Sequence, residues 1–224
     1  MNKLTLCLSL LRSVYLNFKF LPLDEAIKVP LLFHYKFKID KTVKKGMFEF
    51  RGNIFPRMVS FGMNPGSFKI GGGKMSYLRI KKGGKLIFEG KCSFAKGSQI
   101  IVNENGTIVF GKSCSFNANT LLNAGSRITF GDYFLGGWND TILDGDGHII
   151  KNIDTRQIIN VHKPITFGKH CWLAANCSVL KGVTLEDDTI VPYGSVITKS
   201  CGESYVIYGG QPNKVLKRNI YRDE

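Results

Sequence analysis

The sequence predicts an all-β fold in which most of the chain winds into a parallel β-helix. The first observation is a period of six, because a large apolar residue returns at every sixth position from Phe167 to Ile197. The second is a small or β-branched residue four positions after each of these, from Cys171 to Cys201. The third is composition: the 224 residues include 25 glycines and 16 phenylalanines, which favours a turn-rich β fold.

Six is the period of neither a helix nor an alternating strand. It fits a coil of three short faces joined by tight turns, so that three hexads complete one turn. Phe167 should then stack on Leu185, and Leu173 on Val191, with neighbouring turns about 4.8 Å apart. The same phase runs upstream from Phe110 to Phe134, and it breaks between about 139 and 166. Each coil covers the edge of the next, which leaves only the two ends to be capped.

The elements follow in order along the chain. Residues 1–65 form an N-terminal helical and extended subdomain. Its opening stretch MNKLTLCLSLLRSVYLNF is predicted as a helix and not a signal peptide, because Arg12 interrupts the apolar run and no small-residue cleavage site follows. Residues 66–201 form the β-helix, with an excursion loop at about 149–163 where no hexad fits. Residues 202–224 form a short C-terminal segment.

The formal net charge of +14 favours anionic partners. The basic residues are dispersed and no nucleic-acid-binding motif is found, so nucleic acid is not expected. No apolar run reaches the length of a membrane span. The N-terminal helix has two open interpretations: packing against the coil, or holding the protein peripherally at the inner membrane face.

The cysteines are predicted to be structural. Five of the six fall on the small position of the hexad, where a buried apolar side chain is needed, and no Cys-x-x-Cys pair exists. No metal is expected. Reduced thiols favour a cytoplasmic chain.

Three segments carry a family resemblance: DGDGHII at 144–150, KPITFGKHCWLAANCSVLKGVTLEDDTIVPYGSVITKS at 163–200, and YGGQPNKVLKRN at 208–219. With them the chain resembles the hexapeptide-repeat acyltransferases, above all the sugar O-acetyltransferases of surface-polysaccharide gene clusters and the galactoside and maltose acetyltransferases. The resemblance implies a left-handed β-helix, a homotrimer with sites between subunits, and acetyl-CoA as donor. The acceptor would be a sugar, a nucleotide-sugar or a lipid-linked glycan.

The resemblance assigns the general base to His148. An imidazole titrates near neutral pH and can take a proton from a sugar hydroxyl. Asp144 or Asp146 is expected to orient it. Two other interpretations stay open: DGDGH as a mere polar turn, and His162 as a competing base.

The donor and acceptor sites are assigned in the same way. Trp172 is expected to point outward, as a wall for sugar or cofactor or as a subunit contact. The backbone N–H groups near Ala174 and Ala175 are expected to bind the thioester oxyanion. Tyr193 could narrow the cofactor groove. The resemblance implies further coenzyme A contacts at Thr198, Lys199, Lys214 and Lys217. Acceptor contacts are assigned to Asn119, Asn123 and Trp138.

Three other functions remain as alternatives. The first is an N-acetyltransferase acting on an amino nucleotide-sugar. The second is a non-catalytic β-helix that serves as a scaffold or binds glycans, which predicts that coenzyme A is not bound. The third is a zinc carbonic anhydrase on the same fold, which the spacing of His148, His162 and His170 does not favour.

Overall fold

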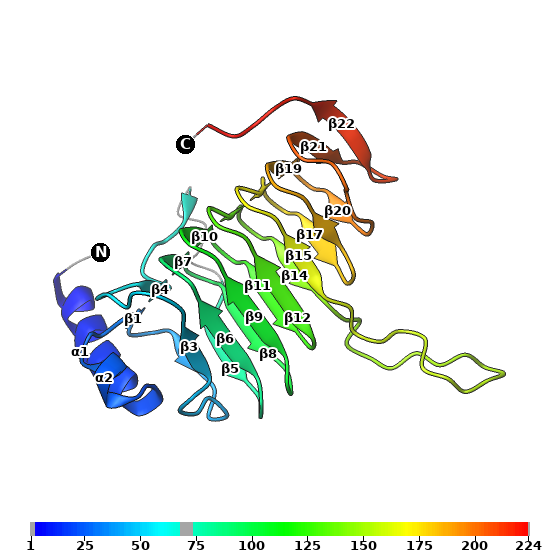
Figure 1. The fold of residues 1–224 in the computed structure, drawn as a ribbon. Helices are drawn as coiled ribbons and strands as arrows, with labels where there is room; N and C mark the ends of the chain where they lie inside the picture. The colour runs from blue at the N-terminus through cyan, green and yellow to red at the C-terminus, as the bar shows by residue number, and fades with distance from the viewer. Residues whose placement is uncertain (1–2, 68–73, 224) are drawn as a thin grey trace.

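The strands wind into a β-helix with three faces, each face a parallel sheet (Figure 1). The computed structural model describes residues 3–67 and 74–223. The first sheet contains β1 (Leu31–Phe33), β4 (Val59–Phe61), β7 (Cys92–Phe94), β10 (Cys114–Phe116), β13 (Leu135–Gly136), β16 (Trp172–Leu173), β19 (Thr189–Val191), β21 (Val206–Gly209) and the antiparallel β22 (Lys214–Arg218).

The other two faces are built in the same way. The second sheet contains β2 (Lys38–Ile39), β5 (Tyr77–Ile80), β8 (Gln99–Val102), β11 (Leu121–Ala124), β14 (Thr141–Leu143), β17 (Ser178–Leu180) and β20 (Val196–Ile197). The third sheet contains β3 (Phe48–Phe50), β6 (Lys85–Phe88), β9 (Thr107–Phe110), β12 (Arg127–Phe130), β15 (Ile165–Phe167) and β18 (Thr184–Leu185). From β1 to β20, successive strands therefore belong to successive faces, whereas β21 and β22 both join the first sheet.

The register confirms the hexad prediction. Phe167 pairs with Leu185 and Leu173 pairs with Val191, one turn of the coil apart. The core is a column of stacked rings: Phe88, Phe110, Phe130 and Phe167 lie in line, with neighbouring centroids 5.0, 5.4 and 5.0 Å apart. Strand spacing in a sheet brings equivalent side chains to this distance, so inward phenylalanines stack face to face.

The coil begins earlier than predicted. β1 pairs with β4, β2 with β5 and β3 with β6, so one full turn is already complete by Phe50. The predicted start at residue 66 instead falls in the connection between β4 and β5. Long connections at 40–47, 51–58 and 62–76 separate the strands from β2 to β5, and they hide the six-residue period.

The cysteines at the small hexad positions are buried, as predicted. Cys92 and Cys114 are paired across neighbouring strands, and both are free thiols. Burial raises the pKa of Cys114 to about 12, and that of Cys171 also to about 12. These thiols remain protonated at neutral pH and fill space in the core.

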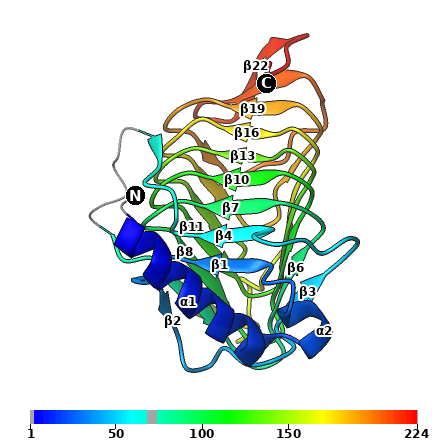
Figure 2. The ribbon, with the colours of Figure 1, turned by 90° about the vertical axis from the view of Figure 1, so that its left-hand side faces the viewer.

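The first turn of the coil is capped by α1 (Lys3–Phe20), which lies across β1; the short α2 (Leu23–Ala26) follows it (Figure 2). The helix uses a polar face to do this. Ser13 Oγ accepts a hydrogen bond from Phe33 N at 2.8 Å. Asn17 donates to Leu31 O at 2.7 Å and accepts from Leu31 N at 3.1 Å. Fully buried Ser13 and Asn17 thus satisfy the open backbone edge of the coil.

A long arm leaves the coil between β14 and β15 and extends into solvent (Figure 1). Its end is a hairpin in which Lys151 bridges Ile158 and Ile159 N donates to Ile150 O at 3.0 Å. This is the excursion expected at about 149–163. Within the described part of the chain, no helix has the length and hydropathy needed to cross a membrane.

Candidate functional site

The arm corner is the edge of the coil where turns join the second sheet to the third, around residues 103–106, 125–126, 144–146 and 181–183. Asp144 is buried there, directly after β14. Its two carboxylate oxygens accept hydrogen bonds from Gly125 N at 2.6 Å and Ser126 N at 2.7 Å. Two backbone donors satisfy the carboxylate and tie the arm to the coil below it.

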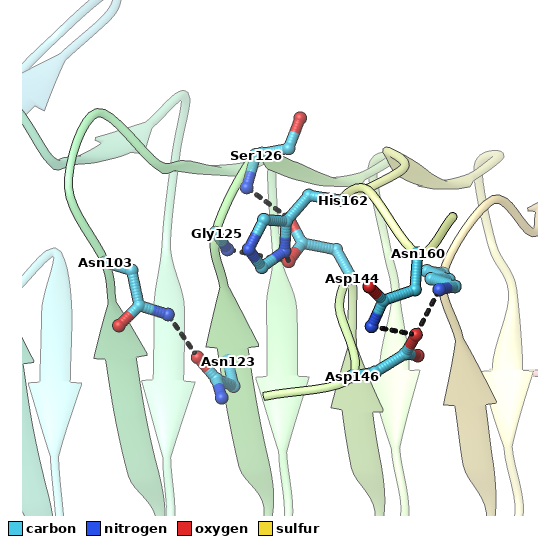
Figure 3. Close-up of polar contacts among 9 residues, drawn as sticks. Asn103, Asn123, Gly125, Ser126, Asp144, Asp146, Asn160 and His162 are labelled. Carbon is cyan, nitrogen blue, oxygen red and sulfur yellow. Dashed lines mark hydrogen bonds and ion pairs between the residues drawn. The ribbon is translucent and has the colours of Figure 1, made fainter. Parts of the chain in front are cut away.

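His162 returns from the arm onto the same carboxylate (Figure 3). Its Nδ1 lies 3.4 Å from Asp144 Oδ1. The ring rests over Gly125 and Gly145, and a Cβ at either position would collide with it. The absence of side chains at these two glycines therefore leaves the space that the imidazole occupies.

A shallow groove runs beside His162. Asn103 Nδ2 donates to Asn123 Oδ1 at 2.8 Å in its floor. The groove is lined by polar and charged groups: Lys81, Asn103, Glu104, Asn123, Gly125, Asp144, Gly145, Gly147 and His162. Carboxylate, amide and imidazole groups of this kind can bind the hydroxyls of a sugar.

Asp146 holds the root of the arm. Its carboxylate accepts hydrogen bonds from Lys181 Nζ and, at 3.0 Å, from Asn160 Nδ2 (Figure 3). These two donors keep the pKa of Asp146 below its ordinary value. Asn160 Nδ2 also donates to His148 O at 2.6 Å. The network fixes the backbone of His148 and leaves its side chain exposed.

Both predicted orienting carboxylates are thus engaged elsewhere. Asp144 contacts His162, and Asp146 contacts Lys181 and Asn160. Neither pairing was expected, because the residues from 160 to 162 return to the corner only after the whole arm has been traversed. Lys181 and Asn160 carried no recognisable motif in the sequence.

The asparagine corner is the edge where turns join the first sheet to the second. Asn119 donates to Asn139 at 3.0 Å, and Asn139 donates to Asn176 at 3.0 Å. All three have positive φ (63°, 58° and 51°), a backbone conformation that asparagine tolerates at turns. Asn119 therefore belongs to a structural ladder on a different edge from Asn123.

Trp138 lies on this second corner with Tyr193, whose ring meets the indole edge-on at 6.5 Å between centroids. Tyr193 is 66% exposed. Trp138, which was predicted to contact the acceptor, and Tyr193, which was predicted to narrow the donor groove, are thus neighbours. The Trp138 and Tyr193 rings could form an aromatic wall for an extended ligand.

The oxyanion prediction needs correction at Ala174. Its N–H donates to Val191 O at 2.9 Å, so the sheet ladder already uses this donor. Ala175 is buried, and its carbonyl accepts from Gly194 N at 2.9 Å. Trp172 is half-buried in β16 beside Ile190 of β19.

The predicted coenzyme A contacts of the C-terminal segment are accessible. Thr198 N donates to Asn213 Oδ1 at 2.8 Å, which docks the Pro212–Asn213–Lys214 turn on the end of the coil. Lys199, Lys214 and Lys217 are exposed, the last two on β22. Across residues 3–67 and 74–223, no three His, Cys, Asp or Glu side chains gather in a way that could hold a metal ion.

Comparison with known proteins agrees with this architecture. No family model matches the chain. The chain is 30% identical over 144 residues to the polysialic acid O-acetyltransferase of Escherichia coli O1:K1, and the match covers 64% of this chain and 44% of that protein. It is 29% identical over 119 residues to the galactoside O-acetyltransferase of Escherichia coli K12, covering 45% and 58%. Over these segments the chain is similar in sequence to two O-acetyltransferases. It spans about half the length of the curated relatives it matches.

The fold is also found in a solved structure. The crystal structure of the polysialic acid-specific acetyltransferase NeuO matches with a TM-score of 0.58 at 18% identity, covering 86% of this chain and 76% of that one. The predicted fold class, a left-handed β-helix of hexapeptide repeats, is therefore confirmed.

Proposed function

We propose that the protein transfers an acetyl group from acetyl-CoA to a hydroxyl of a sugar, with His148 as the general base. The observation that carries this proposal is the polar network at the arm corner, where Lys181, Asp146 and Asn160 hold the backbone of His148 beside a groove of sugar-binding character. Similarity to two O-acetyltransferases supports the reaction class.

The reaction needs few groups. The imidazole takes the proton of the acceptor hydroxyl as its oxygen attacks the thioester carbonyl. The tetrahedral intermediate collapses, the carbon–sulfur bond breaks, and the imidazolium returns the proton to the leaving thiolate. No covalent acyl-enzyme forms, so buried protonated cysteines are compatible with the reaction. The seated His162 is a second candidate base, because Asp144 already contacts its Nδ1.

The active assembly is proposed to be a homotrimer. Two observations support it. The predicted catalytic residues lie on the arm corner, whereas Trp138, Ala174 and Tyr193 lie on the asparagine corner, with the second sheet between them. A neighbouring chain would bring the two sets together. The arm also exposes six large apolar side chains to solvent: Ile149, Ile150, Ile153, Ile158, Ile159 and Val161.

Charges placed on the arm should dissociate the trimer. Ile153 is 78% exposed in the single chain, and an aspartate at an apolar subunit contact would be buried without a partner. The double variant Ile153→Asp/Ile159→Asp is expected to elute as a monomer, measured by size-exclusion chromatography with light scattering. Tyr221→Asp, an equally exposed site away from the arm, is the control and should remain trimeric. An Ile153→Asp/Ile159→Asp trimer would contradict the role of the arm.

The acceptor is proposed as a class of sugars, and the location as the cytoplasm. The relatives act on polysialic acid and on galactosides by name, and a net charge of +14 favours an anionic acceptor, so a surface polysaccharide, its lipid-linked precursor or a nucleotide-sugar would fit. The six free cysteines support a cytoplasmic location. An amino sugar would fit the same site and would make the enzyme an N-acetyltransferase.

Binding of the donor tests the proposal. Ligand at 100 times its dissociation constant stabilises a protein by about 2.7 kcal/mol. Millimolar acetyl-CoA is therefore expected to raise the melting temperature by several degrees. The double variant Lys214→Glu/Lys217→Glu should reduce this increase, because it weakens phosphate binding. Absence of any shift in the wild-type protein would contradict a donor site and favour a non-catalytic β-helix that binds glycans or acts as a scaffold.

A further inference from the structure

The helix α1 is inverted relative to an ordinary surface helix. Its buried positions include Ser9, Ser13 and Asn17, which face the coil. Its exposed positions carry a continuous apolar stripe with the spacing of one helical face: Leu4, Cys7, Leu8, Leu11, Val14, Tyr15 and Phe18. A surface helix normally buries its apolar stripe, so this arrangement needs a separate explanation.

The polar face accounts for how α1 is held. Ser9 Oγ accepts from Tyr35 N at 3.0 Å, and Arg12 donates to Phe37 O at 2.6 Å, in addition to the contacts of Ser13 and Asn17 with β1. Hydrogen bonds to the open edge of the coil, with Leu16 and Phe20 packed beside them, fix the helix. The outward stripe makes no contribution to this docking. Leu11 and Tyr15 remain 66% and 64% exposed.

Positive charge borders the stripe. A hollow beside α1, formed with the connection between β2 and β3, is lined by one carboxylate, Asp40, and by five basic side chains: Arg12, Lys19, Lys41, Lys44 and Lys45. The carboxylate accepts a hydrogen bond from Tyr77 Oη at 2.7 Å, and this bond, together with hydrogen bonding from Thr42, lowers its pKa to about 2. Asp24 and Glu25 are the acidic residues of α2. Basic side chains thus line one side of the apolar stripe.

We propose that the outer face of α1 binds an anionic lipid surface, with the helix lying in the plane of the interface. An apolar stripe bordered by lysines is the pattern of interfacial helices, in which apolar side chains enter the acyl boundary and cations meet lipid phosphates. The 18-residue helix caps the first turn of the coil (Figure 2), so its outer face can contact a flat surface while the arm corner stays accessible. This inference does not depend on the acetyl-transfer reaction.

Cosedimentation with vesicles tests the proposal. The full chain is expected to pellet with vesicles of equimolar phosphatidylglycerol and phosphatidylcholine at about 0.1 M salt and to bind far less at about 1 M, where charges are screened. Vesicles of phosphatidylcholine alone should bind it weakly. Wild-type protein that stays in the supernatant with the anionic vesicles would overturn the proposal.

Two variants separate the contributions of the stripe and the lysines. Leu4→Gln/Leu8→Gln/Leu11→Gln is expected to lower the partition coefficient at least a hundredfold. Lys41→Gln/Lys44→Gln/Lys45→Gln should lower it on the order of a hundredfold, about fivefold for each lysine. All six side chains are exposed, so the circular dichroism spectrum and melting temperature should match the wild type.

The matched control removes an equal number of exposed apolar side chains elsewhere: Met75→Gln/Leu216→Gln/Tyr221→Gln, which should bind as the wild type does. Equal binding by the stripe variant would overturn the proposal. Concentration-dependent self-association that the stripe variant abolishes, without lipid binding by the wild type, would also overturn it and identify the face as a contact between chains.

Discussion

Replacement of His148 by alanine is expected to lower kcat for acetyl transfer by roughly 10²- to 10⁴-fold, the contribution of a general base. The side chain is exposed at the root of the arm, and the network of Asn160, Asp146 and Lys181 holds its backbone and not its ring. Removal of the imidazole should therefore leave the melting temperature and the affinity for acetyl-CoA unchanged. A steady-state assay of free thiol release measures kcat. Melting curves of each variant with and without acetyl-CoA measure the melting temperature and donor binding.

His162→Ala is the matched comparison. It removes an imidazole that lies on two glycines beside Asp144, and kcat is expected to stay within about tenfold of the wild type. The reverse result, a large loss for His162→Ala and a small one for His148→Ala, would transfer the role of base to the Asp144–His162 pair. Equal and large losses would indicate that both imidazoles act on the acceptor.

The stability of the wild-type protein is expected to fall as the pH rises from about 4 to 8 because of Asp140. This carboxyl is fully buried at the asparagine corner, where its Oδ1 accepts from Cys177 N at 2.9 Å. Burial raises its pKa to about 7 from an ordinary value of 3.8. Between these two values the folded state keeps a proton that the unfolded state loses, so the stabilisation present below pH 4 is lost as the pH rises through 7.

Asp140→Asn isolates this effect. The amide oxygen can still accept from Cys177, and no charge is buried at high pH. One ionisation changes the unfolding free energy by about 1.4 kcal/mol per pH unit. Between pH 4 and 8 the wild type should therefore lose on the order of 3 kcal/mol of stability relative to the variant. Urea unfolding at each pH measures it. A difference that does not change with pH would contradict a buried, protonated Asp140.

The hexad period predicted the middle and the end of the coil because inward residues repeat without interruption there. Phe167 and Leu185 pair as expected. The first turn was missed, since long connections separate β2 from β3, β3 from β4 and β4 from β5, and no six-residue period continues through them. The boundary at residue 66 was therefore placed too late.

The site was predictable only in part. The run from Asp144 to His148 was identified by its resemblance to a family motif, and the structure brings it to a grooved corner. The partners of Asp144 and Asp146 come from the far end of the arm and from the next turn of the coil, distances in sequence that no local pattern encodes. For α1 the sequence left two interpretations open, packing against the coil or peripheral membrane contact, because an apolar stripe normally indicates the buried side of a helix; the structure places the stripe outward.

Direct transfer is the measurement that tests the central claim. Wild-type protein, labelled acetyl-CoA and a panel of neutral, anionic and amino sugars should give product with the label on a sugar, and mild alkali should release it, as expected for an ester. The same reaction with His148→Ala should give little product. Label held in an alkali-stable amide would contradict O-acetylation and favour the N-acetyltransferase. Absence of label from every acceptor, with no release of free coenzyme A, would contradict the account.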